Sequence, residues 1–210
     1  MGRKESRIQS WTNRFLLTIF IIFTTQNLIS SPVDDHQERF EDVALKIWEY
    51  AELGYLEEKS SGLLQQELED SGFTIQSGIA GIPTAFIAEY NNGGPVLGIL
   101  GEFDALPGLS QQNVPFKTAE GLSSANGHAC GHHLFGAASA WAVVAIKEWL
   151  EESGTPGTIR FYGTPAEEGG SGKVYIARDG YFDDVDVVLH WHPASGNSAD
   201  AQSSNCLLYT

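Results

Sequence analysis

Apolar residues recur at three- and four-residue steps in several stretches of the chain, and this spacing predicts helices. The first predicted helix runs from Asp34 to Leu53 and is ended by Gly54, and the second runs from Glu57 to Asp70. An alanine-rich apolar stretch from Leu134 to Leu150 predicts a mostly buried helix, and Gly172 to Arg178 predicts a short one.

Short apolar runs bounded by turn residues predict strands. They cover residues 73–76, 84–90, 96–100, 158–162 and 185–189, and the last of them is expected to be buried. The sequence Asn91-Asn92-Gly93-Gly94 predicts a hairpin turn between the second and third strands. Because strands alternate with helices in the second half, we expect an α/β fold whose sheet contains parallel strands, with helices on its faces.

Composition and charge narrow the function classes. The 210 residues include 42% hydrophobic and 11% aromatic residues, which are values of a globular protein. The formal net charge of −15 argues against a nucleic acid as partner, because phosphate binding requires a basic surface.

The N-terminal segment 1–31 has the pattern of a secretory signal peptide. Four basic residues up to Arg14 precede an apolar run at 15–23, and small and polar residues follow up to Ser31. The apolar run is shorter than the roughly 20 residues that span a bilayer. We therefore expect a secreted or periplasmic protein, with an uncleaved membrane anchor as the alternative. Export also makes a disulfide between Cys130 and Cys206 the simplest structural role for the cysteines.

Three short segments concentrate the side chains that bind metals. Residues 127–133 read Gly-His-Ala-Cys-Gly-His-His, residues 165–170 read Pro-Ala-Glu-Glu-Gly-Gly, and residues 190–193 read His-Trp-His-Pro. Thiolate, imidazole and carboxylate are ligands of zinc and similar divalent metals. A metal ligand is therefore a better interpretation of Cys130 than a disulfide.

Spacing suggests how these groups divide their roles. Of His128, Cys130 and His132, two can reach one ion, and the third would point elsewhere or lie behind the ligands. Glu167 and Glu168 follow a strand, and on extended backbone they would point to opposite sides, one to the metal and one to a substrate water. Ligands of parallel sheets bind beyond the carboxyl ends of the strands, so the groups that follow strands should converge there. These groups are Asp104, Glu167, Glu168 and His192, with Glu102 alternating with Asp104 on the same strand end.

Four phrases together resemble one family of metallopeptidases and amidohydrolases, of the glutamate carboxypeptidase and indole-acetyl-amino-acid hydrolase type. They are Gly-Glu-Phe-Asp-Ala-Leu-Pro-Gly-Leu-Ser-Gln at 101–111, Gly-His-Ala-Cys-Gly-His at 127–132, Phe-Tyr-Gly-Thr-Pro-Ala-Glu-Glu-Gly-Gly-Ser-Gly-Lys at 161–173 and Trp-His-Pro at 191–193. Within the family, the branch of aminobenzoyl-glutamate utilisation proteins is the most similar. The resemblance implies a three-layer α/β/α, zinc-aminopeptidase-like catalytic domain.

The resemblance also implies roles for individual residues. Metal ligands would be Cys130, His132, Glu168 and His192, with His190 as the alternative to His192, and the ions would be one or two of Zn or Mn. Glu167 would be the general base, and Asp104 would orient a ligand or the base. The implied reaction is hydrolysis of the amide bond of a small N-acyl amino acid or dipeptide-like molecule, such as an aminobenzoyl-glutamate.

The resemblance to the family covers only part of the length of its members. It runs over about 32–197 as the N-terminal part of the catalytic domain, and 198–210 diverge, so we expect the chain to stop before the dimerisation or lid domain. Two hypotheses follow. The first is an amidohydrolase, acting as a homodimer or with a complementing subunit. The alternative is a truncated, catalytically inactive metal-binding fragment or a partner-binding subunit.

Overall fold

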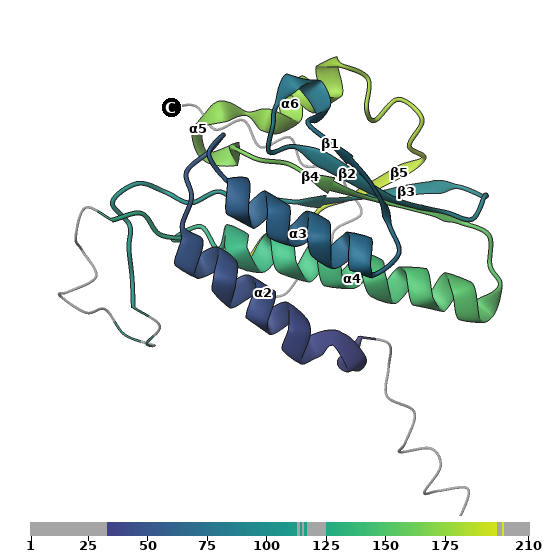
Figure 1. Cartoon of the computed structure of the whole chain (residues 1–210), viewed down its shortest axis with the longest axis horizontal. Coiled ribbons are helices and arrows are strands. Elements are labelled where there is room, and N and C mark those ends of the chain that lie inside the picture. The colour runs from purple at the N-terminus through teal and green to yellow at the C-terminus, as the bar shows by residue number, and fades with distance from the viewer. Residues whose placement is uncertain (1–32, 113, 115, 117–124, 197–198, 200–210) are drawn as a thin grey trace, which may run out of the picture.

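The computed structural model describes residues 33–112, 114, 116, 125–196 and 199. The predicted signal peptide, the divergent tail and Cys206 lie outside these residues. The described chain forms a five-stranded mixed sheet with helices on both faces (Figure 1). This is the α/β arrangement that the alternation of strands and helices predicts.

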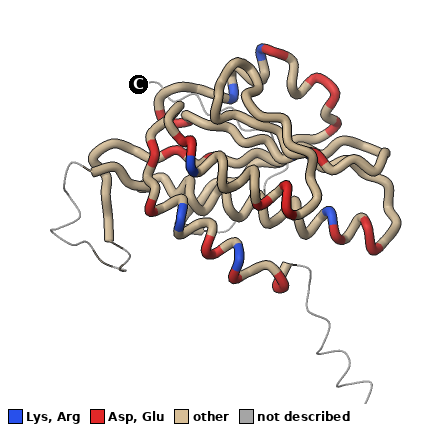
Figure 2. Tube along the Cα trace, viewed as in Figure 1, with Lys and Arg blue, Asp and Glu red and all other residues tan. Residues whose placement is uncertain are grey.

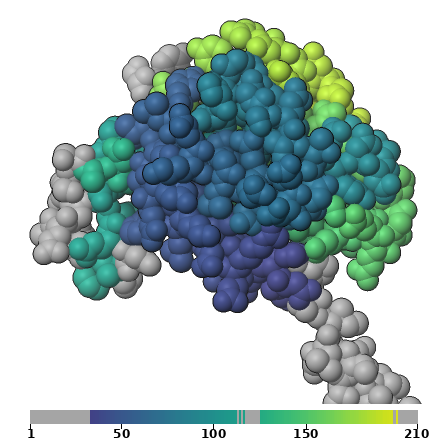
Figure 3. Space-filling model, in the orientation of Figure 1, coloured from purple at the N-terminus to yellow at the C-terminus, as the bar shows by residue number. Residues whose placement is uncertain are grey.

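Three helices cover one face of the sheet. A 3-10 turn, η1 (Asp34–His36), leads into α2 (Gln37–Tyr50), and α3 (Glu58–Asp70) and α4 (His132–Ser153) pack beside it. The first helix is shorter than predicted, because the chain leaves the helix at Ala51, which has left-handed backbone angles (φ 42°), and not at Gly54. The side of the molecule shown in Figure 3 is formed mostly by residues of the first half of the chain, among them those of α2 and α3.

The opposite face is covered more lightly. It carries the 3-10 turn η2 (Ile79–Gly81) and the helices α5 (Glu167–Gly170) and α6 (Gly172–Arg178). Ile176 of α6 is fully buried in a second apolar cluster with Leu100, Phe135 and Tyr162. The two covered faces give the three-layer order.

The strand order is β1-β2-β4-β3-β5. The strands are β1 (Thr74–Ser77), β2 (Phe86–Asn91), β3 (Val96–Gly101), β4 (Thr158–Gly163) and β5 (Val187–Leu189). β4 pairs antiparallel with β2 and parallel with β3, and β3 pairs parallel with β5. The carboxyl ends of β3, β4 and β5 therefore lie at one edge of the sheet.

Two predictions about strands are wrong. The turn at 91–94 does connect β2 to β3, but these strands do not pair, because β4 lies between them. β5 is not buried: Val187, Val188 and Leu189 are 51%, 42% and 50% exposed. The strand has one hydrogen-bonded neighbour, β3, and β5 is an open edge of the sheet within the described chain.

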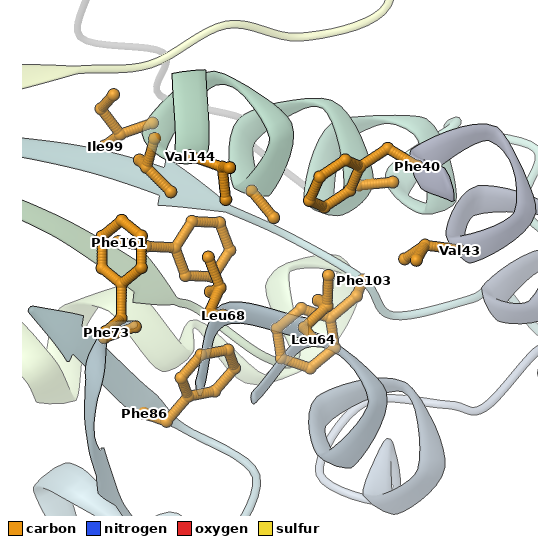
Figure 4. Close-up of a cluster of buried hydrophobic side chains, with 14 of the residues drawn as sticks. Phe40, Val43, Leu64, Leu68, Phe73, Phe86, Ile99, Phe103, Val144 and Phe161 are labelled. Atoms are coloured by element: carbon orange, nitrogen blue, oxygen red, sulfur yellow. The ribbon is translucent and has the colours of Figure 1, made fainter. Parts of the chain in front are cut away.

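The main core lies between the sheet and α2, α3 and α4 (Figure 4). Aromatic rings fill it, and the ring of Phe86 lies 5.5 Å from that of Phe161 and 6.3 Å from that of Phe103, between ring centroids. The apolar face of each helix supplies the rest, including Phe40, Val43, Ile47, Leu64, Leu68, Val143 and Val144. The predicted helical periodicities thus identify the residues that are buried.

Acidic residues outnumber basic ones on the described chain (Figure 2). In Figure 2 lysines and arginines are scattered among more numerous acidic residues over the described chain. None of the helices described here is both long enough and apolar enough to cross a membrane.

Candidate metal centre

The predicted convergence at the carboxyl ends of the strands is present. Glu102 and Asp104 follow β3, Glu167 and Glu168 follow β4, and the His190–Pro193 segment follows β5. His132, at the start of α4, faces all three groups. The site is therefore assembled around one imidazole from three strand ends and one helix end.

His132 is fully buried between two carboxylates. Its Nδ1 donates to Asp104 Oδ1 at 2.8 Å, and its Nε2 lies 2.9 Å from Glu102 Oε2 without hydrogen-bond geometry. Burial alone would lower the pKa of His132, but Asp104 and Glu102 outweigh it and raise the pKa to about 10. The imidazole therefore carries both ring protons in the metal-free protein at neutral pH.

Cys130 and His192 meet on the outer side of this cluster. The Sγ of Cys130 lies 3.3 Å from Nε2 of His192, and one donor atom from each of Cys130, His132 and His192 fits within 4.8 Å. Gly131, between the cysteine and His132, has φ 80° and lies against Pro193, where a Cβ would come within 3.1 Å. Glycine at this position lets the chain bring the Cys130 and His132 side chains to the same place.

Glu167 and Glu168 lie near the same imidazole. Glu167 Oε2 and Glu168 Oε1 are each 3.9 Å from Nε2 of His132. The prediction that they point to opposite sides of extended backbone is wrong, because they begin the helical turn α5, where neighbouring side chains diverge less. Ala166, directly before them, has left-handed angles (φ 57°, ψ 43°) and turns the chain from β4 into α5.

Asp104 connects these two parts of the site. Its Oδ1 accepts from His132, and its Oδ2 accepts from the backbone N–H of Glu168 at 2.9 Å. The carboxylate is fully buried. The family resemblance implies that Asp104 orients a ligand or the base, and these two contacts are compatible with either role.

Glu102 is the residue that sequence reasoning undervalued. Its side chain is 3% exposed, and Lys173 of α6 forms an ion pair with its Oε1. Burial would raise the pKa of Glu102, but His132, His190 and Lys173 outweigh it and hold the pKa well below its usual range. One possible ligand atom from each of Glu102, His132 and Glu167 also lies within 4.8 Å of the other two. The sequence indicates this role for Glu102 only through its position two residues before Asp104, which places both side chains on the same side of the strand end.

The two histidines of the 190–193 segment are both at the site but touch different partners. His190 Nε2 lies 3.6 Å from Glu102 Oε1, whereas His192 contacts Cys130. Trp191 between them donates to Ser139 Oγ at 3.0 Å, which anchors the segment to α4. Either histidine can supply a ligand from this position, so His190 stays open as the alternative to His192.

Two other histidines have a structural role. His128 is buried and its Nε2 donates to the carbonyl of Ile47 at 3.0 Å, so it is the member of the 128–132 group that points elsewhere. Its ring lies 5.1 Å from that of His133, between centroids. Burial lowers the pKa of His133 to about 4, with His128 and His132 adding to the effect, so this pair is neutral at pH 7.

The donor set fits a divalent metal. Three buried atoms at the centre have no hydrogen-bond partner: Glu102 Oε2, His132 Nε2 and Glu168 Oε1. Buried polar atoms without partners are unusual in folded proteins, because each costs free energy. Together with a thiol and a further imidazole they are the ligand types that zinc takes.

Comparison with known proteins agrees with this chemistry. The model of Peptidase family M20/M25/M40 matches residues 98–204, which include every residue expected from the sequence to bind metal or to act as the base. The chain is 46% identical over 165 residues to a p-aminobenzoyl-glutamate hydrolase subunit of Escherichia coli (strain K12), covering 79% of this chain and 34% of that protein. It is 32% identical to a Xaa-Arg dipeptidase of Mus musculus, covering 80% of this chain and 38% of the relative.

A solved structure supports the fold. A Bacillus subtilis protein described as a dinuclear metal-binding peptidase of the M20 family superposes with a TM-score of 0.64 at 26% identity, over 75% of this chain and 43% of the other. The chain spans between a third and two fifths of the length of the two curated relatives.

Proposed function

The chain belongs to Peptidase family M20/M25/M40, and from this premise we propose that it is the metal-binding part of an amidohydrolase. The bond cleaved is the amide of a small N-acyl amino acid or dipeptide-like substrate. The observation that carries the proposal is the cluster of three buried atoms without hydrogen-bond partners, Glu102 Oε2, His132 Nε2 and Glu168 Oε1, with the carboxylate of Glu167 3.9 Å from the same Nε2.

We assign the metal ligands to Cys130, His132, Glu168 and His192, with His190 as the alternative to His192. A divalent ion held there would act as a Lewis acid, polarising a substrate carbonyl and making water more acidic. A thiolate ligand favours zinc, and manganese is the alternative. The similarity to a dinuclear metal-binding peptidase supports a second ion beside the first, with Glu102 as a candidate donor.

Glu167 is the proposed general base. Its side chain is 35% exposed, so it can contact substrate, whereas Glu168 is more deeply placed at 21%. Burial raises the pKa of Glu167, and the neighbouring Glu102 raises it further. A base whose pKa lies closer to neutral can take a proton from water at one carboxylate oxygen and return it to the leaving amine.

Asp104 is the proposed orienting residue. By accepting from both His132 and the backbone of Glu168, it fixes the imidazole and the start of the α5 turn at once. Partners of this kind, behind metal ligands, typically contribute about 10–100-fold in affinity or activity.

The proposed substrate class follows the relatives' chemistry. The E. coli relative carries p-aminobenzoyl-glutamate in its name, and the mouse relative is a dipeptidase; both names describe cleavage of an amide next to an amino acid. We propose an aminobenzoyl-glutamate-like molecule as the first substrate to test.

We further propose that the active form includes more protein than this chain. The exposed apolar strand β5, beside Trp191 at 39% exposure, is a suitable surface for a complementing subunit or a second copy. The E. coli relative is itself called a subunit. The second candidate function, a metal-binding or partner-binding fragment without activity, draws its support from the same open edge.

For location we propose export, on the pattern of residues 1–31, which lie outside the described residues. Fractionation of the source cells with N-terminal sequencing of the mature chain tests this. A chain that begins at Met1 in the cytoplasm would contradict it, and one that begins at Met1 in the membrane would favour the anchor.

The decisive experiment is Glu167→Gln, assayed with aminobenzoyl-glutamate and with zinc content measured in parallel. We expect the variant to keep its metal and lose hydrolysis, while Glu152→Gln, an exposed glutamate at the end of α4, keeps both. The assay uses the chain alone and the chain extended to the length of its relatives. Undiminished turnover in Glu167→Gln would remove Glu167 from its role, and metal binding without hydrolysis in either wild-type form would favour the fragment.

A further inference from the structure

A buried carboxylate outside the proposed ligand set lies directly behind the α5 turn. Glu57, at the start of α3, is 0% exposed. Within the described chain no lysine, arginine or histidine forms an ion pair with it. Burying an unpaired carboxyl group is costly, so a position of this kind needs a compensating role.

The contacts of Glu57 point to the turn. Its Oε1 accepts a hydrogen bond from the backbone N–H of Ala166 at 2.8 Å, across 109 positions of sequence. Its Oε2 accepts from the hydroxyl of Thr84 at 3.1 Å, which fixes the carboxyl group from the side of the sheet. No backbone carbonyl of the described residues accepts from the same Ala166 N–H, so Glu57 is its partner.

Ala166 is a position where the backbone needs support. Its left-handed conformation is unfavourable for a residue with a Cβ. Its angles set the direction in which Glu167 and Glu168 leave β4. A backbone held in an unfavourable conformation persists only when its surroundings enforce it.

The neighbours of Glu57 in sequence hold the other parts of the same turn. Gly54 lies so close to Ala166 that a Cβ on it would be 2.9 Å from the Ala166 Cβ. The hydroxyl of Tyr55 donates to the carbonyl of Gly170, the last residue of α5. Residues 54–57 therefore hold the α5 turn at both its beginning and its end.

We propose that Glu57 is a positioning residue for the metal centre: by accepting from the N–H of Ala166, it keeps the α5 turn in the conformation that directs Glu167 and Glu168 at His132. Its importance for function rests on the proposed function, because it acts only through those two carboxylates. The geometry itself is independent of the substrate.

The test measures zinc affinity of the chain by competition with a chelator at about pH 8, together with the absorption spectrum of the cobalt-substituted protein. Glu57→Leu removes the acceptor and should weaken zinc binding about 10–100-fold, the usual effect of losing a group behind a metal ligand. Glu57→Gln keeps a carbonyl oxygen for Ala166 and should stay within about threefold of wild type on the same reasoning. Thr84→Val, a milder change, should weaken binding by roughly threefold to tenfold.

A purely structural role predicts a different result. Leu68→Ala opens the core on the same helix, away from the turn, and should lower stability without changing the zinc affinity or the cobalt spectrum of the folded protein. If Glu57→Leu binds zinc as wild type does, if Leu68→Ala weakens binding equally, or if Glu57→Gln is as weak as Glu57→Leu, the proposal is wrong. Should Glu57→Leu not fold, Thr84→Val decides, and wild-type affinity in that variant refutes the proposal.

The proposed function can fail separately. If the wild-type chain binds no zinc, or if Cys130→Ala leaves its affinity unchanged, the ligand assignment is wrong. If Cys130→Ala weakens binding while Glu57→Leu does not, the ligand assignment stands and only the positioning role of Glu57 is refuted.

Discussion

Zinc binding to this chain should release about two protons per ion at about pH 8. In the metal-free protein His132 is doubly protonated, because its pKa is raised to about 10. Burial raises the pKa of the Cys130 thiol to about 12, and the carboxylates of Glu168 and Glu167 add to this. As the proposed ligand atoms, His132 Nε2 and Cys130 Sγ would have to lose these protons to bind the ion, so metal binding and deprotonation should be coupled.

The size of the effect follows from these values. At about pH 8 the His132 pKa lies about two units above the pH, and removing its proton uses about 3 kcal/mol of the metal's binding free energy. With about two protons released, the apparent affinity should rise about 100-fold for each unit of pH between about 7.5 and 8.5. The sign is fixed: a higher pH favours the deprotonated ligands and therefore tighter binding.

Isothermal titration calorimetry in two buffers of different ionisation enthalpy measures the proton number directly. An ordinary imidazole is already neutral at about pH 8, so a proton lost from His132 reports on its raised pKa. Cys130→Ala should release about one proton and show about a tenfold rise per pH unit, whereas His36→Gln, at the far end of α2, should release the wild-type number. Release of less than one proton by the wild type would show that His132 and Cys130 do not bind as proposed.

Three further predictions follow. Burial raises the pKa of Glu57 from 4.5 to about 7, so folding favours the neutral form of this side chain. The free energy of unfolding of the wild type, measured with urea and compared with that of Glu57→Gln, should therefore fall by up to about 3 kcal/mol as the pH rises from about 4.5 to about 7. Parallel pH profiles of the two proteins would contradict this. Gly163→Ala would bring a Cβ within 2.2 Å of the Phe86 ring and should cost about 1–3 kcal/mol, whereas Gly62→Ala, with open space on α3, should stabilise by up to about 1 kcal/mol in the same assay. Zinc at about 100 times its Kd should stabilise the fold by about 2.7 kcal/mol, which is measured as a rise in Tm. A chelator should reverse this rise, and Cys130→Ala should not show it at the same zinc concentration.

The elements that carry the site could be predicted because their signals are local. Apolar periodicity identified α3 within one residue and α4 within three, and short apolar runs identified β3 and β4 within one residue. Once β3, β4 and β5 are parallel, the residues that follow them must meet at one edge. The gathering of Asp104, Glu167 and His192 around His132 is a consequence of that topology.

The pairing of the strands could not be predicted in the same way. The turn at 91–94 has the composition of a hairpin, and nothing local shows that β4, more than 60 residues later, pairs with both β2 and β3. The exposure of β5 is likewise a property of its neighbours, since Val187, Val188 and Leu189 have the composition of a covered strand. Apolar composition reports what a strand can bury, and the fold decides what covers it.

The roles of Gly54 and Glu57 were hidden for a related reason. Gly54 was expected to end a helix, but Ala51 does so, and the glycine is needed where the chain passes Ala166. Glu57 has the appearance of an ordinary acidic residue at a helix start. Its contact with Ala166 joins segments 109 residues apart, and only the folded chain shows it.

The charges at the site lead to a last prediction, on salt. Four carboxylates, from Glu102, Asp104, Glu167 and Glu168, lie near two cations, His132 and Lys173. One divalent ion that displaces the protons of His132 and Cys130 adds two charges and removes two, so the charge of the cluster does not change. The first ion should therefore bind with a steep dependence on pH and a shallow dependence on salt.

A second ion would differ, because the remaining candidate donor, Glu102, has a pKa held well below its usual range and no proton to lose. Such an ion would change the charge of the cluster by two units. Its affinity should depend little on pH and fall clearly between about 0.05 and 0.5 M salt, roughly the range over which the Debye length shortens from above 10 Å to below 5 Å. Calorimetric titrations at the two salt concentrations separate the ions by these dependences. If the first ion is as sensitive to salt as the second, the exchange of one ion for two protons at His132 and Cys130 is refuted.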